Sequence, residues 1–305
     1  MKKKIVLAGG TGFIGRGIIQ YFGQADFDFV ILTRNPQKRD DGVKEVLWDA
    51  KTLGPWTNEL EGAEALINLT GKSVNCRYTE ANKHEIIESR THSTGILGTA
   101  LLQLKQAPKV WLNSSSATVY RYSEDRNMDE LTGELGNDFS PGVVKAWEKS
   151  FNDVPLPATS KFALRISIVL GKGDGVMPRL INLVRFGLGG KQGNGAQFFS
   201  WIHEDDLYRI MLWCINNPDK QGVYNCCVPN PVTNSYLMRS MRRVMGMPFG
   251  LPASESMLFV GAMIIGTETE LILKSRRVVP TNLLRQGFVF TYPEINSALK
   301  NLFSA

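Results

Sequence analysis

Residues 3–15 read Lys-Lys-Ile-Val-Leu-Ala-Gly-Gly-Thr-Gly-Phe-Ile-Gly, and this stretch decides the fold class. The apolar residues Ile5 to Ala8 predict a buried strand, glycines follow at Gly9, Gly12 and Gly15, and a helical pattern begins at once. A strand that turns sharply into a helix directs backbone N–H groups and the positive end of the helix dipole at one point. The stretch therefore predicts a turn that binds phosphate.

Each glycine of this turn has its own expected role. Gly9 permits the tight turn, Gly12 lets a pyrophosphate approach the backbone, and Gly15 lets the helix pack close to the strand. An ordinary strand–turn–helix is the alternative, but the position between a strand and a helix near the N-terminus favours a dinucleotide. The residues expected to hold the dinucleotide at this turn are Gly9, Thr11, Gly12, Phe13, Ile14 and Gly15.

The end of the next strand indicates which dinucleotide is bound. The apolar, β-rich run 29–33 predicts a strand that ends at Arg34, nineteen residues after Gly15. An acidic residue near this point suits the ribose hydroxyls of NAD, whereas a basic residue suits the 2′-phosphate of NADP. Thr33 and Arg34 offer a hydroxyl and a forked guanidinium. We therefore expect NADP(H) in preference to NAD(H), the alternative being that Arg34 is a solvated strand-end residue.

Composition excludes several classes of protein. The chain has 305 residues, of which 43% are hydrophobic and 21% charged, which is typical of a globular protein. The net charge of +6 suits anionic ligands, but no dense basic block follows Lys2 to Lys4, so nucleic acid is not an expected partner. Four cysteines without metal-ligand spacing predict reduced thiols, no metal site and a cytoplasmic location.

The apolar runs are too short for a targeting or membrane segment. The N-terminal run spans only residues 5–8 before glycines begin, so it predicts a strand rather than a signal peptide. The run 257–265 is too short to cross a bilayer, and it predicts a buried helix face that continues to residue 273. We therefore expect no membrane partner.

Strands and helices alternate up to about residue 170. This alternation predicts an α/β fold of the Rossmann type, a doubly wound parallel sheet covered on both faces. Ligands of such sheets lie beyond the carboxyl ends of the strands, which points to Gly9–Gly15, Arg34, Leu69–Gly71 and Ser114–Ser116. The predicted strands are 5–8, 29–33, 45–48, 65–69, 109–114 and 161–168, and the predicted long helix is 79–105.

The pattern becomes less regular after residue 170. We expect a dinucleotide-binding domain over residues 1–170, with parts of the later chain returning to it, and a smaller, mostly helical lobe over 171–305. Within this lobe, helices are predicted over 176–187 and 205–215, and Thr233 or Asn234 is expected to cap another. The glycine-rich stretch 187–195 is a turn between helices or a lid.

Residues 114–120, Ser-Ser-Ser-Ala-Thr-Val-Tyr, resemble the strand-five motif of the extended short-chain dehydrogenases/reductases, above all the sugar-nucleotide epimerases. The glycine triplet and the string Ser-Trp-Ile-His-Glu-Asp-Asp at 200–206 agree with that family. Strings at 77–79, 146–148, 187–190, 229–234 and 287–288 resemble one branch of it, the "epimerase family proteins". The resemblance covers nearly the whole chain. It implies that Leu69, Thr70 and Gly71 lie against the adenine side of the cofactor and that Ser114 adjoins it.

The resemblance also implies catalytic roles. A serine at the Ser116 position holds a reacting hydroxyl or carbonyl, a tyrosine at the Pro141 position is the acid/base, and Lys145 lowers the pKa of that tyrosine and holds the nicotinamide ribose. The proline side chain cannot exchange a proton, so the acid/base of the usual mechanism is missing at this position. Tyr120 is a candidate substitute, with packing at a loop edge as its alternative role.

Four further polar residues are candidate substitutes or ligands with simpler structural roles. Asp138 and Glu148, which flank the altered motif, are expected to be solvated or to cap a helix. Arg165 is expected in a structural ion pair, and His203 in a structural hydrogen bond.

Two functions follow from these expectations. The first is an NADP(H)-dependent oxidoreductase or sugar-nucleotide epimerase-like enzyme that acts on a small hydroxylated substrate, with nucleotide-linked sugars among the candidates. The second is a catalytically inactive NADP(H)-binding sensor or regulator, which the loss of the tyrosine at Pro141 favours. A homodimer through the long helices is common in the superfamily and is a further expectation.

Overall fold

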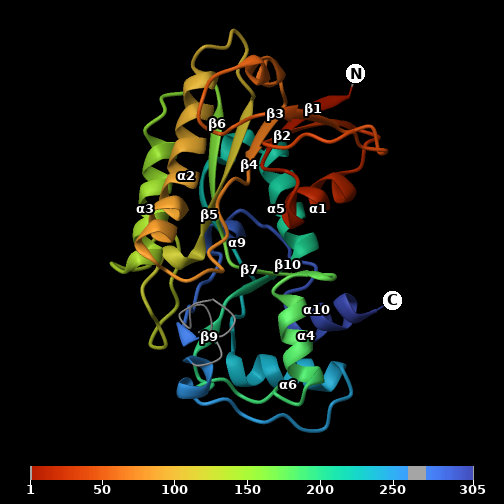
Figure 1. Cartoon of the computed structure of the whole chain (residues 1–305), viewed down its shortest axis with the longest axis vertical. Helices are drawn as coiled ribbons and strands as arrows, with labels where there is room; N and C mark the ends of the chain where they lie inside the picture. Colours follow the sequence, from red (N-terminus) through yellow and green to blue (C-terminus); the bar gives the residue numbers. More distant parts are fainter. Residues whose placement is uncertain (1, 260–272, 305) are drawn as a thin grey trace.

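A seven-stranded parallel sheet forms the centre of the N-terminal part of the protein in the computed structural model, which describes residues 2–259 and 273–304 (Figure 1). The strand order is β11-β6-β5-β4-β1-β2-β3. Successive strands run outward from β1 in one direction and from β4 in the other, so the order reverses between β1 and β4. Its strands are β1 (Lys3–Ala8), β2 (Phe27–Thr33), β3 (Lys44–Leu47), β4 (Ala65–Asn68), β5 (Val110–Ser116), β6 (Ser160–Ile166) and β11 (Gly222–Cys226).

Helices cover both faces of this sheet, as predicted for a doubly wound α/β fold (Figure 1). Alternate side chains of a strand point to opposite faces, so Ile5 and Leu7 enter one core cluster and Val6 and Ala8 the other. The first cluster packs under α1 and α5, and the second under α2 and α3. These helices are α1 (Phe13–Phe22), α2 (Glu80–Leu101), α3 (Phe139–Asn152) and α5 (Glu204–Asn216), with short 3-10 helices η1 (Pro55–Leu60), η2 (Ala117–Val119) and η3 (Pro218–Lys220) between elements.

The six predicted strands and the predicted long helix are present, with shifted ends. The strand predicted over 161–168 is divided into β6 and β7 (Ile168–Gly171), because the chain leaves the large sheet at Ser167. The helix predicted over 79–105 begins one residue later, since the Thr79 side chain accepts a hydrogen bond from the Asn82 N–H and caps it. β11 is not among the predicted strands, and it forms an edge of the sheet by pairing with β6.

The C-terminal lobe contains short strands as well as the predicted helices. β10 (Trp201–His203), β7 and β8 (Asp174–Gly175) form one small sheet, and β9 (Phe198–Phe199) pairs with β12 (Val232–Thr233). Thr233 caps α6, as expected, by accepting a hydrogen bond from the Tyr236 N–H. The buried helix face predicted over 257–265 and on to 273 lies largely outside the described residues. The helices of the lobe are α4 (Met177–Arg185), α6 (Asn234–Val244), α9 (Thr281–Arg285) and α10 (Ile295–Phe303).

The segment 200–206 ties the C-terminal residues to α5. The buried carboxylate of Asp206 accepts hydrogen bonds from the backbone N–H groups of Thr291 and Tyr292, each at 2.8 Å. His203 stacks on the ring of Tyr292, with 4.0 Å between centroids, and its Nε2 lies 3.1 Å from Oδ1 of Asn301. His203 therefore has the structural role expected of it.

This packing predicts a pH-dependent stability. Burial lowers the pKa of His203, although the charge of Asp205 opposes the shift, so the folded protein keeps this ring neutral. In the unfolded chain the ring has a pKa of about 6.5, so it becomes protonated as the pH falls below that value. This protonation shifts the folding equilibrium toward the unfolded state. Urea denaturation should show a free energy of unfolding about 1 kcal/mol lower at about pH 5.5 than at about pH 7.5 from this residue.

His203→Asn should remove that part of the pH dependence while keeping a side-chain acceptor for the N–H of Asp205. The matched control is His92→Asn, because the His92 side chain is 54% exposed and should leave the dependence unchanged. An equal dependence in wild type and His203→Asn would contradict the assignment.

Within the described residues, no helix combines the length and the apolar character needed to cross a membrane.

Candidate functional site

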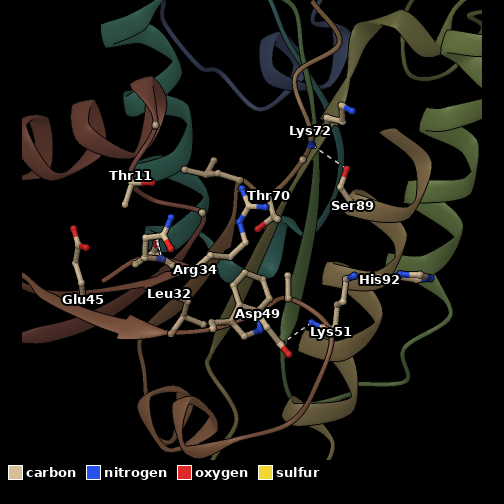
Figure 2. Close-up of a pocket in the computed structure, with 18 of the residues that line it drawn as sticks. Thr11, Leu32, Arg34, Glu45, Asp49, Lys51, Thr70, Lys72, Ser89 and His92 are labelled. Atoms are coloured by element: carbon tan, nitrogen blue, oxygen red, sulfur yellow. Dashed lines mark hydrogen bonds between the residues drawn. The ribbon is translucent and has the colours of Figure 1, made fainter. Parts of the chain in front are cut away.

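A cavity of about 1090 Å³ opens beyond the carboxyl ends of β1, β2, β3 and β4 and is closed on one side by α2 (Figure 2). It lies where the strand order reverses, the place at which doubly wound sheets bind ligands. Three segments that are far apart in sequence meet there, namely the turn after β1, the end of β2 and the turn after β4. The predicted site residues that line the cavity are Gly9, Thr11, Gly12, Thr33, Arg34, Leu69, Thr70 and Gly71.

The glycine turn has the local geometry that the sequence predicts. Gly9 has a φ of +75°, and an added Cβ would lie 3.1 Å from Oγ1 of Thr70. A Cβ at Gly15 would overlap the carbonyl oxygen of Gly10, so only glycine lets α1 start this close to the turn. A Cβ at Gly12 would meet nothing within 4 Å. Gly12 is the N-cap of α1 and brings no side-chain cap, so the first N–H groups of the helix stay available to a ligand.

Four residues expected at the dinucleotide do not line this cavity. An added Cβ at Gly175 would lie 3.2 Å from the ring of Phe13, so Phe13 packs on the β7–β8 hairpin instead. Ile14 packs against the hydrophobic core, and Gly15 is buried in the first turn of α1. Ser114 is 8% exposed near the end of β5. Their expected contact with the dinucleotide stays a prediction, and for Phe13 and Ile14 it would be made by the backbone N–H groups at the start of α1.

Arg34 lies exposed at the cavity and makes no hydrogen bond or ion pair to any residue in the described ranges. The other arginine of the lining, Arg39, is paired with Asp41 and lies 3.4 Å from a carboxylate oxygen of Glu45. Glu45 also accepts a hydrogen bond from the Gln37 N–H at 2.8 Å. The guanidinium of Arg34 is therefore free to bind an anion.

Sequence reasoning missed the residues that follow β3. Asp49 lines the cavity and accepts hydrogen bonds from the N–H groups of Lys51 and Thr52, each at 2.9 Å, which lower its pKa to about 2. Since all strands of the sheet are parallel, the carboxyl end of β3 could have been named by the same rule that named the others. The lining residues missed at this end are Trp48, Asp49, Ala50 and Lys51.

The α2 side of the cavity was also missed, and the sequence carries no signal for it. Lys72 donates a hydrogen bond to Oδ1 of Asn82 at 2.7 Å and pairs with Glu85. The Lys72 N–H donates to Oγ of Ser89 at 2.9 Å (Figure 2). These contacts fasten the turn after β4 to the first turns of α2. The α2 residues of the lining are Glu85, Glu88, Ser89 and His92.

A buried polar network holds the carboxyl ends of β4 and β5 against α2 and α3. Asn68 donates from Nδ2 to Oδ1 of Asn113 at 2.7 Å and to Oγ1 of Thr94 at 3.1 Å. Trp147 donates from Nε1 to the same Thr94 oxygen at 3.0 Å. Buried polar groups with partners on four elements fix the relative position of those elements. The network therefore makes the ligand-facing edge of the sheet rigid.

Ser116 lies at the end of β5, and Lys145 lies on α3. Oγ of Ser116 accepts a hydrogen bond from the Thr118 N–H at 3.2 Å and so caps η2. Nζ of Lys145 donates to Oδ1 of Asn137 at 3.1 Å. α3 packs against η2 and β5, which brings these two groups to the same end of the sheet. Neither is among the residues that line the cavity.

Tyr120 is buried within the protein, whereas a group that transfers a proton to a substrate must be accessible to that substrate. Its side chain is fully buried, its hydroxyl donates to Oδ1 of Asn225 at 3.0 Å, and it accepts from Nη1 of Arg165 at 2.8 Å. Burial raises its pKa to about 12. Pro141 is buried in the first turn of α3, where proline removes no helical hydrogen bond. These contacts argue against Tyr120 as the substitute for the missing tyrosine.

Glu148 corrects another expectation. It is not solvated, because α3 turns it toward the sheet, where its side chain is 12% exposed. Its two oxygens accept from Nε and Nη2 of Arg165, each at 2.8 Å, and one of them accepts from Oγ of Ser115 at 2.6 Å. The structural ion pair predicted for Arg165 is thus confirmed, with Glu148 as its partner. Asp138 precedes α3 and pairs with Lys274, and its side chain is 64% exposed, as expected.

The described part of the chain contains no group of three or more His, Cys, Asp or Glu side chains arranged to hold a metal ion. Its four cysteines, Cys76, Cys214, Cys226 and Cys227, are free thiols.

Comparisons with known proteins all point to one protein family. Residues 5–227 match the model of the NAD dependent epimerase/dehydratase family, and residues 259–302 match a domain of unknown function, DUF1731. The chain is 31% identical to the epimerase family protein SSP1921 of Staphylococcus saprophyticus, over 98% of this chain and 99% of that protein. It is 29% identical to the epimerase family protein YfhF of Bacillus subtilis, over 98% of each.

A solved structure agrees with these relatives. The crystal structure of human epimerase family protein SDR39U1 (isoform 2) with NADPH superposes with a TM-score of 0.86 and 27% identity, over 98% of both chains. The match therefore spans the large sheet and the C-terminal lobe together. The glycine turn, the strand order and the matched segments agree, and the chain belongs to the NAD dependent epimerase/dehydratase family.

Proposed function

We propose that this protein binds NADP(H) across the carboxyl ends of β2, β1 and β4. The observation that carries the proposal is Arg34, a guanidinium without a partner in the described residues, at the end of β2 in the cavity that also holds the glycine turn. The first N–H groups of α1 would hold the diphosphate, and Arg34 with Thr33 the 2′-phosphate. Leu69, Thr70 and Gly71 would lie against the adenine side.

The residues present fit such a ligand. The space around Gly12 is open, and the helix start has no side-chain cap. Oγ1 of Thr70 is a buried hydroxyl oxygen with no hydrogen-bond partner among the described residues. The human relative with a TM-score of 0.86 was solved with NADPH, and this supports the same cofactor here.

We further propose that the protein is an oxidoreductase or epimerase-like enzyme for a small hydroxylated substrate such as a nucleotide-linked sugar. A bound nicotinamide dinucleotide supplies or accepts a hydride. Oγ of Ser116 would hold the reacting hydroxyl or carbonyl oxygen of the substrate, and Nζ of Lys145 would hold the ribose next to the nicotinamide. A cytoplasmic location, a boundary near residue 170 between two domains, and a homodimer through the long helices belong to the same proposal.

A second candidate function is a sensor or regulator that binds NADP(H) without turnover. Pro141 at the usual tyrosine position and the burial of Tyr120 favour it, because neither residue offers an accessible proton donor.

Conversion of a substrate distinguishes the two functions. The protein is incubated with NADPH or NADP+ and a panel of nucleotide-linked sugars and small carbonyl compounds. NADPH absorbance is followed, and the products are separated by chromatography. A reductase oxidises NADPH with at least one of them, whereas an epimerase converts a sugar to its epimer with no net loss of cofactor. In either case Ser116→Ala lowers kcat about 100-fold, the effect of removing one hydrogen-bond donor from a reacting oxygen. Ser297→Ala, at an exposed serine of α10, is the control and should keep full activity. Binding of NADPH with no turnover on any compound would favour the sensor.

A further inference from the structure

Arg90 of α2 is a half-buried cation held between two elements of the ligand-facing edge. A Cβ built at Gly71 would lie 3.0 Å from its Cζ, and its guanidinium lies over the ring of Trp147, with 5.2 Å from Cζ to the centroid. Nη1 donates to the carbonyl oxygen of Ile86 at 2.9 Å. The guanidinium thus fills the space between the turn after β4 and α3.

This guanidinium has no anionic partner within the chain as described. No carboxylate of residues 2–259 and 273–304 lies within 4.0 Å of its nitrogens. The acidic residues of the same helix are engaged elsewhere, since Glu85 pairs with Lys72 and Glu88 lies 2.9 Å from His84. The guanidinium of an arginine has five N–H donors, and the hydrogen bond to Ile86 is the only one that this guanidinium makes to the described residues.

Such a position is unfavourable for the protein alone. Loss of solvent lowers the pKa of Arg90 to about 10, which reflects the free-energy cost of placing a charge where water is excluded. A stacked tryptophan and one carbonyl oxygen offset part of that cost. An oxyanion from a ligand would offset the rest and could form two parallel hydrogen bonds with the guanidinium fork.

The surroundings of Arg90 indicate where that oxyanion comes from. Gly71 follows Thr70, which packs on Gly9 of the phosphate-binding turn, so Arg90 lies next to the proposed dinucleotide site. Gly71 lines the cavity but Arg90 does not, so the guanidinium lies behind Gly71, on the side of β5 and α3. Ser116 and Lys145 belong to that side too.

We propose that Arg90 binds a phosphate or carboxylate group of a ligand that lies over the carboxyl ends of β4 and β5. The anion is either the nicotinamide-side phosphate of the dinucleotide or an acidic group of the substrate. This proposal rests on the proposed function, because it places the ligand over the same strand ends. The absence of a side chain at Gly71 is part of the site, since a Cβ there would press on the guanidinium.

The test uses Arg90→Met, which removes the charge and keeps an unbranched side chain against Trp147, and Arg90→Lys, which keeps the charge. Lys83→Met is the matched control, because Lys83 is a cation of the same helix that lies over an α3 ring, Phe139, at 5.7 Å. Calorimetry measures the binding of NADPH and of adenosine 2′,5′-bisphosphate, which lacks the nicotinamide-side phosphate. Thermal denaturation of each ligand-free variant shows that it folds.

If the anion is the cofactor phosphate, Arg90→Met lowers the affinity for NADPH at least about tenfold, which is the effect of losing a charged hydrogen bond. Adenosine 2′,5′-bisphosphate then binds all variants equally, and Arg90→Lys recovers part of the loss. If the anion belongs to the substrate, NADPH affinity is unchanged, but inorganic phosphate at constant ionic strength raises the Tm of the wild-type NADPH complex and not that of Arg90→Met. In both cases ligand-free Arg90→Met is at least as stable as wild type, whereas a purely structural arginine would lower the Tm when replaced.

The proposal is overturned if Arg90→Met matches Lys83→Met in both NADPH binding and the phosphate effect, or if its ligand-free form is clearly less stable with binding unchanged. Failure of the cofactor proposal gives a different result, in which wild type binds neither NADPH nor adenosine 2′,5′-bisphosphate. The phosphate titration of the ligand-free proteins then still tests Arg90.

Discussion

Replacing Arg165 with methionine is expected to lower the free energy of unfolding by about 3–5 kcal/mol, because it leaves a buried carboxylate without its partner. Glu148 accepts both of its Arg165 hydrogen bonds at 2.8 Å, and the two side chains are 10% and 12% exposed. The hydroxyl of Tyr120 would lose a donor in the same variant. Urea denaturation followed by circular dichroism measures the change.

Two further variants separate the ion pair from simple loss of packing. The double variant Arg165→Met/Glu148→Met removes both charges and should recover most of the stability, since apolar side chains can replace a buried pair with little loss. Lys149→Met is the matched control on the same helix. Its partner Asp153 lies at 2.5 Å, but the side chains are 74% and 60% exposed, so its loss should be below about 1 kcal/mol. Equal losses for Arg165→Met and Lys149→Met would contradict the account of Glu148.

Replacing Arg34 with alanine is expected to weaken NADPH binding about 30-fold, or by about 2 kcal/mol, the contribution of a hydrogen bond to a charged group. NADH lacks the 2′-phosphate, so its affinity should not fall. Arg34 is exposed and has no hydrogen bond or ion pair to the described residues, so the substitution should leave the Tm unchanged. Calorimetry with both cofactors measures the two affinities.

Lys38→Ala is the control for Arg34→Ala. Lys38 is an exposed cation of the same loop, but it does not line the cavity. If Arg34 acts only through the net positive charge of the protein, both variants should lower the affinity for NADPH to a similar extent. An effect confined to Arg34 supports direct contact with the 2′-phosphate, whereas a parallel loss of NADH affinity would contradict it.

The part of the site that was predictable from sequence lies in the backbone and at strand ends. Glycine spacing fixes the turn between β1 and α1, because steric exclusion at Gly9 and Gly15 is a local property of the chain. The parallel sheet then brings Arg34 and Leu69–Gly71 to the same edge. Neither step requires knowledge of how helices rotate about their axes.

The contacts that the sequence did not predict depend on how each helix is rotated about its axis when it packs. Glu148 looks like a surface residue beside the altered motif, and only the packing of α3 on the sheet turns it toward Arg165. Phe13 follows a phosphate-binding glycine but packs on the β7–β8 hairpin. β11 is a short edge strand. It can pair with β6 only because the chain returns from the C-terminal lobe to the large sheet. The position of Arg90 over Trp147 likewise requires two helices to meet.

The most direct test of the central proposal is calorimetry of the wild-type protein with NADP+, NADPH, NAD+ and NADH. The free guanidinium of Arg34 at the cavity, beside a glycine turn with room for a diphosphate, predicts micromolar binding of NADP(H) and affinity at least about tenfold weaker for NAD(H). Binding of none of the four, or tighter binding of NADH than of NADPH, would contradict it.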